Sequence, residues 1–388
     1  MSTHTPKNPL VVPMRPRSRS EVHRASTPLE LFFDLVFVVA VALAAARLHH
    51  GVIENHVGGA LLSYVMVFFA IWLAWMNFSW FASAYDTDDV PYRLLVMVQL
   101  VGALVLAAGV PSAVESQNWL LVTVGYSILR LALIAQWYRA WQCDPLRRKT
   151  IIRYMLGLVL TQLAWIGLLF APVALKLPLF FALVLMELVV PVFAEMTGEQ
   201  TPWHPEHIVE RFGLFTIIVL GESILSASMA IQAAMNSGAM NADFMQLIAG
   251  GVLIVFATWW TYFEQTEHDI EASPSTALRW GYGHYFIYAS IAAMGAGLAA
   301  SVDFALGEAH ASRELVNASV AVPVAICLLS IAVVHGRIKS AGVNALVLLL
   351  ALVAIVASIW TGYSVLLTGL ILSAFLAFRL WLSRAKNT

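Results

Sequence analysis

LELFFDLVFVVAVALAAAR, residues 29–47, is an apolar stretch that carries two carboxylates, Glu30 and Asp34, one helical turn apart near its start. A second stretch, ERFGLFTIIVLGESILSASM at residues 210–229, begins with Glu210 two places before a Phe and holds another acid, Glu222. A carboxylate in an apolar membrane-spanning segment is costly unless it faces protein or a water-filled cavity. The two stretches therefore predict inner helices around which a helical bundle is built.

The composition of the whole chain agrees with a membrane protein. Of its 388 residues, 60% are hydrophobic and only 12% are charged, and the mean hydropathy is +0.79. A spanning helix needs about 20 mostly apolar residues. A scan with a window of that length predicts twelve spans, at residues 29–47, 58–80, 94–112, 118–138, 151–170, 177–195, 212–231, 245–263, 282–302, 315–334, 341–360 and 363–381.

The distribution of Lys and Arg predicts how the spans are oriented. With the N-terminus inside, the outer loops and helix ends hold only Arg47, Lys176 and Arg313. Basic residues gather in cytoplasmic segments, so this asymmetry predicts that both termini are cytoplasmic. Residues 1–25 are polar and basic, and we expect them to form a disordered cytoplasmic tail. The other basic residues near span ends then fall inside: Arg93, Arg139, Arg147, Arg148, Lys149, Arg153, Arg211, Arg279, Arg337, Lys339, Arg384 and Lys386.

The chain also contains a repeated pattern. The second and the eighth predicted spans both end in an aromatic cluster, followed by an acidic loop and an Arg before the next span. Six spans in each half would insert the two halves the same way up, as a parallel repeat. We therefore predict a disordered tail at residues 1–25, a first six-helix repeat at 26–200 and a second six-helix repeat at 201–388.

Several long motifs resemble one known family. They are ELFFDLVFV at residues 30–38, YDTDD at 85–89 followed by Arg93, ERFGLFTIIVLGES at 210–223, WWTYFE at 259–264 and GYGHYF at 281–286. Together they are similar to the bacterial low-temperature requirement protein A (LtrA) family, and the resemblance covers nearly the whole chain. It implies a multi-pass protein of the bacterial inner membrane. It implies no molecular activity, because the family name records a growth phenotype.

The acids of the first and seventh predicted spans are candidate transport residues. Glu30 and Asp34 are four residues apart and share one helix face. In a structural interpretation, Glu30 favours the positive end of its helix and Asp34 accepts hydrogen bonds from a neighbouring helix. In a functional interpretation, the two acids form a proton or cation site at the inner mouth of a path, together with Glu210.

Other ionisable residues fall inside predicted spans. Arg130, Glu187 and Glu222 lie near the middle of their spans, where charges are expected to pair, so Arg130 should bind either Glu187 or Glu222. The remaining acid would suit a proton relay, whereas a static ion pair that fixes helix register explains the same residues. His284 is the candidate for a proton-handling imidazole, with a packing histidine as the alternative. His204, His207 and Glu210 are spaced by three, which is too weak a pattern to predict a metal site.

The acidic loops suggest a different class of function. Paired acidic clusters can hold Mg²⁺ against a diphosphate, an arrangement that resembles UbiA-type prenyltransferases, although the spacing here is not theirs. The alternative is a pair of solvated loops whose acids bind Arg93 and Arg279. The candidate residues of such an enzyme are Asp86, Asp88, Asp89, Glu264, Glu267 and His268.

Aromatic residues flank both groups of acids. They suit either a membrane-interface belt or the walls of a pocket for a cation or an isoprenoid. The residues that we expect to line such a pocket are Phe33, Trp80, Arg93, Trp260 and Tyr262.

Two functional hypotheses follow. The first is a secondary transporter or channel-like permease for a proton, a cation or a small solute, which needs no cofactor. The second is an intramembrane enzyme that uses Mg²⁺ on a lipid-borne or prenyl-diphosphate substrate. The sequence has no GxSxG, P-loop, HExxH or CxxC motif, which disfavours an ATP-driven pump or a zinc protease. The expected partners are membrane lipid and a small solute or ion, with a homodimer allowed and no nucleic acid.

Overall fold

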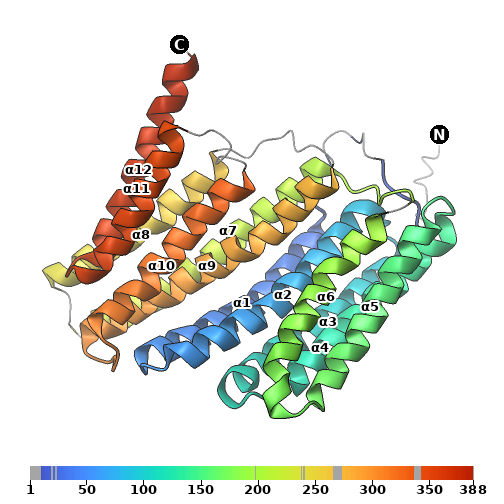
Figure 1. Cartoon of the computed structure of the whole chain (residues 1–388), viewed down its shortest axis with the longest axis horizontal. Coiled ribbons are helices and arrows are strands. Elements are labelled where there is room, and N and C mark those ends of the chain that lie inside the picture. Colours follow the sequence, from blue (N-terminus) through green and yellow to red (C-terminus); the bar gives the residue numbers. More distant parts are fainter. Residues whose placement is uncertain are drawn as a thin grey trace, which may run out of the picture. The chain divides into compact units, whose positions relative to one another are not determined.

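The computed structural model describes residues 10–18, 21, 24–196, 198–236, 238, 241–264, 273–335 and 342–387. In these residues the chain is all-helical, as predicted (Figure 1). The helices are α1 (Pro28–Ile53), α2 (Val57–Tyr85), α3 (Val90–Ser116), α4 (Leu120–Cys143), α5 (Arg148–Leu169), α6 (Val173–Glu195), α7 (Pro205–Asn236), α8 (Ala242–Phe263), α9 (Pro274–Leu306), α10 (Arg313–Val334), α11 (Val343–Ala357) and α12 (Ser364–Asn387). A short 3₁₀ turn, Ser358–Trp360, follows α11.

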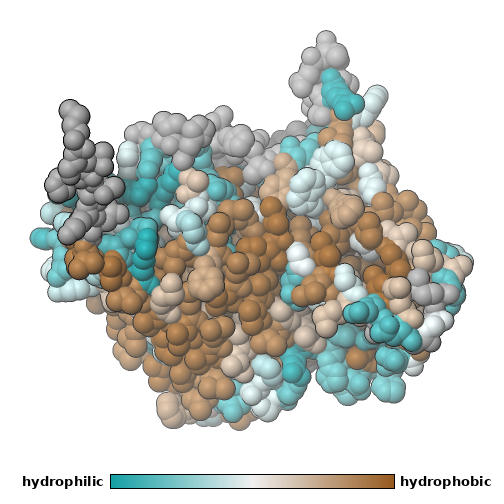
Figure 2. Space-filling model, turned by 180° about the vertical axis from the view of Figure 1, so that it is seen from behind, coloured by the Kyte–Doolittle hydropathy of each residue, from teal (hydrophilic) through white to brown (hydrophobic). Residues whose placement is uncertain are grey.

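Twelve of the described helical segments are long and apolar enough to cross a membrane. Large apolar side chains are exposed along them, for example Leu163 on α5, Leu185 on α6 and Leu350 on α11. Apolar residues cover much of the surface visible in Figure 2. Exposed side chains of this kind are suited to lipid rather than to water. The twelve predicted spans are confirmed, whereas the parallel repeat and the cytoplasmic placement of the termini stay predictions.

Local sequence sets the helix ends. Asp89 accepts a hydrogen bond from the backbone N–H of Tyr92 and caps α3, and Asn241 caps α8 in the same way through Phe244. Such side chains satisfy N–H groups that the first helical turn leaves free. Pro111 lies inside α3, which ends where Gln117 adopts a φ of +55°. A spanning helix tolerates an internal proline because neighbouring helices can bind the backbone groups that the proline leaves without a hydrogen-bond partner.

The contacts divide the chain into two units. Unit 1 consists of residues 1–40, 73–113 and 117–211, and unit 2 consists of residues 41–72, 114–116 and 212–388. Helices α1, α2, α3 and α7 therefore each contribute to both units. The predicted repeat boundary at residues 200–201 lies close to the change of unit at 211–212, but the division within α1 and α2 does not follow from a simple repeat.

Unit 1 packs α4 against α5 and α5 against α6. Gly102 of α3 and Gly125 of α4 allow a close approach, because a Cβ atom at Gly125 would lie 2.6 Å from the carbonyl oxygen of Gly102. Arg130 and Glu187 form a buried ion pair at 2.5 Å that joins α4 to α6. Small residues and buried polar pairs are common ways of holding helices together inside membranes.

Unit 2 packs α9 along α10, and α12 against both α8 and α11 (Figure 1). Gly250 of α8 and Gly369 of α12 mark a close crossing, since a Cβ atom at Gly369 would lie 2.8 Å from the carbonyl oxygen of Gly250. A Cβ atom at Gly297 of α9 would likewise clash with the carbonyl oxygen of Ser319 in α10. The helices of this unit are therefore also held by small residues at their crossings.

The described part of the N-terminal segment differs from the disordered tail expected for residues 1–25. The backbone N–H of Val12 donates to Asp89, and that of Arg17 donates to the carbonyl oxygen of Ala84. The side chains of Met14 and Arg24 are buried. The segment is ordered here because its backbone and the side chain of Arg24 bind the C-terminal end of α2 and the loop before α3.

Candidate functional site

Four buried ionisable residues meet in unit 1, where the first turns of α1 and α7 face each other. Glu30 and Asp34 come from α1, and His207 and Arg211 come from α7. Their side chains are 0–1% exposed. Residues four apart on a helix share one face, so each helix presents a pair to the other. We call these four residues the α1–α7 polar cluster.

Arg211 is the centre of the cluster. Its Nη2 atom lies 2.5 Å from Oδ1 of Asp34, and its Nη1 atom lies 3.0 Å from Oε1 of Glu30. Nη2 also donates to the hydroxyl of Ser79 in α2, at 3.3 Å. One guanidinium is thus shared by two carboxylates, which leaves the pair of acids with only one fully charged partner in direct contact.

The start of α1 fixes Glu30. Thr27 precedes the helix and Pro28 begins it, and the backbone N–H of Glu30 donates to the hydroxyl of Thr27. In return, Oε2 of Glu30 accepts from both the N–H and the hydroxyl of Thr27, at 2.8 and 3.0 Å. This reciprocal pattern is a capping box. One oxygen of Glu30 therefore takes part in capping the helix, while the other faces Arg211.

Asp34 is held by tertiary contacts rather than by its own backbone. Its Oδ1 atom accepts from Nε1 of Trp75 at 2.7 Å as well as from Arg211. Its Oδ2 atom is buried and has no hydrogen-bond partner in the part of the chain that the structure describes, and the same is true of Nε of Arg211, Nδ1 of His207 and the hydroxyl of Tyr92. Buried polar groups normally have partners. The cluster therefore keeps free hydrogen-bonding capacity for water, a proton or a small ion.

His207 adds a titratable group beside Glu30. Its Nε2 atom lies 3.3 Å from Oε1 and 3.4 Å from Oε2 of Glu30, and its ring is fully buried. A neutral imidazole would donate to the carboxylate from Nε2, and an imidazolium would pair with it. Glu30 thus contacts one permanently charged group, Arg211, and one imidazole whose charge can change.

A second layer of charge lies just outside the cluster, at the end of α2. Arg24 donates to the backbone carbonyl oxygens of Ala82 and Ser83, and burial lowers its pKa. Burial, reinforced by the charge of Glu30, raises the pKa of Asp86 to about 6, although Arg24 acts in the opposite direction. The rim of the cluster therefore contains a carboxyl group that titrates close to neutral pH.

The sequence prediction identified the acids of this site but not its bases. Arg211 was noted only as a basic residue near a span end, and His207 only in a weak metal pattern. The adjacent Glu210, which was predicted to belong to the site, is exposed and accepts from the backbone N–H of Ser26 at 3.2 Å. The spacing of His207 and Arg211 by four was the signal that could have found them.

The mid-span charges have other roles. Arg130 binds Glu187, one of the two predicted partners, and its guanidinium also donates to Thr161, Tyr126 and the carbonyl oxygen of Leu158. Glu187 accepts a further bond from Trp165. Glu222 is in unit 2, is half-buried and accepts from Ser226 at 3.2 Å. The Arg130–Glu187 ion pair matches the interpretation of these charges as a static pair that fixes helix register.

His284 also has the contacts of a packing residue. Its Nδ1 atom lies 2.6 Å from the carbonyl oxygen of Trp280, and its Nε2 atom lies 2.8 Å from the hydroxyl of Tyr262. The ring is fully buried and packs against Phe212 and Tyr288. Both ring nitrogens are satisfied when Nδ1 carries the proton, so the geometry favours the structural alternative.

Two acids of the loop after α2 bind basic residues. Asp88 pairs with Arg93 at 2.7 Å on the surface, as the structural alternative predicted, and Asp89 pairs with Arg139 at 2.6 Å. In unit 2, Glu264 lies 3.6 Å from Arg379. Glu267 and His268 fall outside the described residues. Among the residues that are described, no three His, Cys, Asp or Glu side chains are placed to hold a metal ion.

The predicted pocket-lining aromatics lie in varied environments. Phe33 is fully buried and packs on Phe78, with ring centroids 4.0 Å apart. Trp80 contacts Trp203 edge-on, and Tyr262 is buried beside His284. Trp260 is 50% exposed. Of these residues, Phe33 adjoins Asp34 of the α1–α7 polar cluster in the chain.

Comparisons with known proteins agree with the family resemblance. A family model described as bacterial low temperature requirement A protein (LtrA) matches residues 25–381, a range that includes the whole cluster. An uncharacterized protein of Rhizobium meliloti (strain 1021) is 26% identical over 291 residues, which cover 71% of this chain and 69% of that protein. No solved structure matches the chain.

Proposed function

Because the chain belongs to the bacterial low temperature requirement A (LtrA) family, and because twelve of its described segments can span a membrane, we propose that it is a secondary transporter or channel-like permease. It moves a proton, another cation or a small solute, and the α1–α7 polar cluster carries the charge-dependent step. The bacterial inner membrane is the proposed location.

The observation that carries this proposal is the sharing of Arg211 by Glu30 and Asp34 in a fully buried site. A buried ion pair that only fixes helix register needs one acid and one base, as Arg130 and Glu187 illustrate in the same unit. Burying a second carboxylate costs free energy unless it too is neutralised. A site that holds one extra acid, a histidine and unpartnered polar atoms is suited to binding and releasing a positive charge.

The charges of the cluster define a simple exchange. With both acids ionised, Arg211 protonated and His207 neutral, the four residues carry one net negative charge. A proton or a monovalent cation at the free Oδ2 atom of Asp34 would balance it and would weaken the hold of Asp34 on Arg211. Glu30 could then keep Arg211, because its contacts with Thr27 and His207 are independent of Asp34. Arg24 and Asp86 both interact electrostatically with Glu30 from outside the cluster.

The test replaces Asp34 by Asn, which keeps an oxygen acceptor for Trp75 and Arg211 but removes the titratable charge. Purified full-length protein is reconstituted into liposomes that contain a pH-sensitive dye, and proton flux is followed under an imposed membrane potential. We expect Asp34→Asn to reduce flux by at least about tenfold, because the charge-binding oxygen is lost.

Asp88→Asn is the matched control, since Asp88 is an acid of the same unit that pairs with Arg93 on the surface. It should leave the flux close to that of the unchanged protein. The proposal fails if Asp34→Asn protein, folded as judged by its thermal midpoint, conducts protons as fast as the unchanged protein. It also fails if the unchanged protein conducts no faster than protein-free liposomes, with or without added small solutes.

A further inference from the structure

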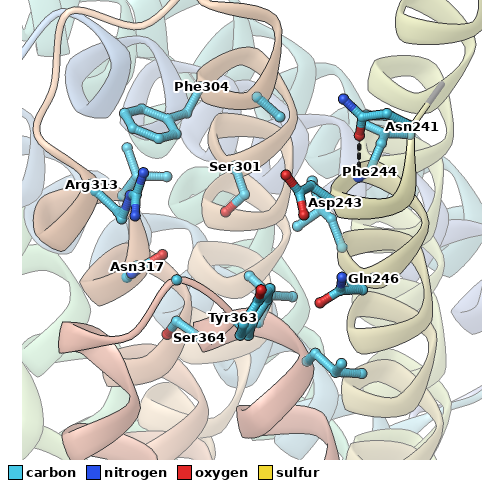
Figure 3. A pocket seen from close by; sticks show the side chains of 16 residues that line it. Asn241, Asp243, Phe244, Gln246, Ser301, Phe304, Arg313, Asn317, Tyr363 and Ser364 are labelled. Carbon is cyan, nitrogen blue, oxygen red and sulfur yellow. Dashed lines mark hydrogen bonds between the residues drawn. The ribbon is translucent and has the colours of Figure 1, made fainter. Parts of the chain in front are cut away.

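Unit 2 contains a cavity of about 400 Å³ between the first turns of α8 and α10, the end of α9 and the turn before α12 (Figure 3). Its size falls in the range of small-molecule sites. The cavity is separate from the residues used above, and Arg313 and Asp243, both of which line it, have no role in the proposed charge exchange.

Two opposite charges lie on different walls of this cavity. Asp243 comes from α8 and Arg313 from α10 (Figure 3). Both side chains are exposed, and neither forms a hydrogen bond or an ion pair with another residue that the structure describes. The guanidinium lies over the turn before α12, since a Cβ atom at Gly362 would be 3.8 Å from Nη1 of Arg313. Each charge is therefore available to a ligand in the cavity.

Polar side chains line the cavity beside apolar ones, and several of the polar side chains are held in place. The amide nitrogen of Asn317 donates to the backbone carbonyl oxygens of Ile359 and Thr361, at 2.8 and 3.1 Å, which fixes the turn against α10. The hydroxyl of Ser364 lies 3.1 Å from that of Ser358. The side-chain carbonyl oxygen of Asn317 and the amide of Gln246 remain on the lining. A pre-formed site loses less entropy when it binds a small ligand.

Both helices also begin at the cavity. Asn241 caps α8, and Ser312 caps α10. The N-terminal ends of helices carry partial positive charge and favour an anionic group. The start of α10 and Arg313 together provide a place for one carboxylate, while the carboxylate of Asp243, in the first turn of α8, would repel a second negative group and attract an ammonium.

We propose that this cavity binds a small zwitterion of the amino-acid type. The carboxylate of the ligand binds the guanidinium of Arg313 beside the first turn of α10, and its ammonium binds Asp243. The neutral amides and hydroxyls between them accept a short polar or uncharged side chain. The proposal concerns binding and does not require the transport activity proposed above.

The test is isothermal titration calorimetry on the purified full-length protein in detergent. The probes are the twenty standard amino acids, with propionate as the carboxylate alone and propylamine as the ammonium alone. We expect at least one amino acid to bind, and to bind at least about tenfold more tightly than either single-charge probe, because it uses both walls.

Arg313→Gln and Asp243→Asn should each weaken that binding by about tenfold or more, through the loss of one charge-assisted contact. Glu314→Gln is the control, because Glu314 is an exposed acid next to Arg313 that does not line the cavity, and it should leave the affinity unchanged. Unaltered thermal midpoints show that each variant is folded.

Three results would overturn the proposal. One is equal affinity for propionate or propylamine, which would make the cavity a site for a single charge. Another is an amino-acid affinity that survives both Arg313→Gln and Asp243→Asn in folded protein. The third is the absence of any binding heat with every amino acid at about 10 mM, a concentration that detects dissociation constants in the millimolar range.

Discussion

Asp86 is an acid at the rim of the α1–α7 polar cluster whose ionisation depends on folding. It is only 5% exposed, and its burial raises its pKa from 3.8 to about 6. The charges around it are Glu30 and Asp88, which reinforce the shift, and Arg24 and Arg17, which oppose it. Its Oδ1 atom accepts from the backbone N–H of Asp88 at 3.0 Å, a bond that an Asn could also accept.

We expect the stability of the protein to depend on pH through Asp86. The folded state keeps a proton on this carboxyl group between about pH 3.8 and 6, where the unfolded chain has released it. The resulting stabilisation is complete below about pH 3.8 and is lost as the pH rises through about 6. Asp86→Asn should therefore raise the free energy of unfolding at pH 7 by roughly 2–3 kcal/mol. The pKa of Asp86 differs by about 2 between the folded and the unfolded state, and each pKa unit corresponds to about 1.36 kcal/mol.

Thermal midpoints of the purified protein and of Asp86→Asn, measured from pH 4 to pH 8, check this expectation. The difference between them should be largest above pH 6 and should shrink toward pH 4. Glu308→Gln serves as the control because Glu308 is an exposed acid whose charge is not among those that act on Asp86. A difference in thermal midpoint that is constant over the whole pH range would contradict the interpretation that the ionisation of Asp86 causes the pH dependence.

The buried charged residues of unit 1 differ in how readily the sequence alone predicts them. Glu30, Asp34 and the Arg130–Glu187 pair could be found from the sequence, because a charge inside an apolar run is visible without a structure. Arg211 and His207 precede the apolar core of their helix, in a segment that reads as an ordinary cytoplasmic end. Their burial depends on the end of α2 and on the N-terminal segment, which cover them only in the folded chain.

At the level of helices, close packing depends on particular glycines. A Cβ atom at Gly125 of α4 would lie 2.6 Å from the carbonyl oxygen of Gly102 and would also meet the backbone of Leu106 in α3. Backbone atoms cannot move aside as a flexible side chain can. At Gly167 of α5, in contrast, no atom lies within 4 Å of an added Cβ.

These two positions give opposite expectations for the same substitution. Gly125→Ala should lower the free energy of unfolding by roughly 2 kcal/mol, because α3 and α4 must separate. Gly167→Ala should be neutral or should stabilise by up to about 1 kcal/mol, since Ala is the better helix former. Unfolding by SDS titration in mixed micelles measures both, and equal effects at the two positions would contradict the close crossing of α3 and α4.

The existence of the helices was easier to predict than their ends. Hydropathy identified all twelve, but α9 begins at Pro274 rather than near residue 282, because Ser273 caps it and Pro fits the first turn. The segment 282–302 is only the apolar part of that helix. Polar turns that extend a spanning helix beyond the bilayer carry no hydropathy signal, and these are the turns in which His207 and Arg211 lie.

For the whole molecule, the sequence predicts one orientation of all twelve spans. Both termini are cytoplasmic in this prediction, so the connection before α7 is inside and the connection between α9 and α10 is outside. Glu206 is exposed at the start of α7, and Glu308 is exposed between α9 and α10. These two positions report on opposite faces of the membrane without disturbing either proposed site.

Cysteine labelling in intact cells tests the orientation. Cys143 and Cys327, neither of which is in a disulfide, are first replaced by Ala, and a single cysteine is introduced as Glu206→Cys or Glu308→Cys. A membrane-impermeant maleimide should label position 308 in intact cells, and position 206 only after permeabilisation. The reverse pattern would invert the topology, whereas labelling of both positions in intact cells would break the alternation of the spans between them.

With position 308 outside, the nearby start of α10, which carries Arg313, would face the outer medium. The zwitterion cavity would then open to the side from which a bacterium meets external solutes.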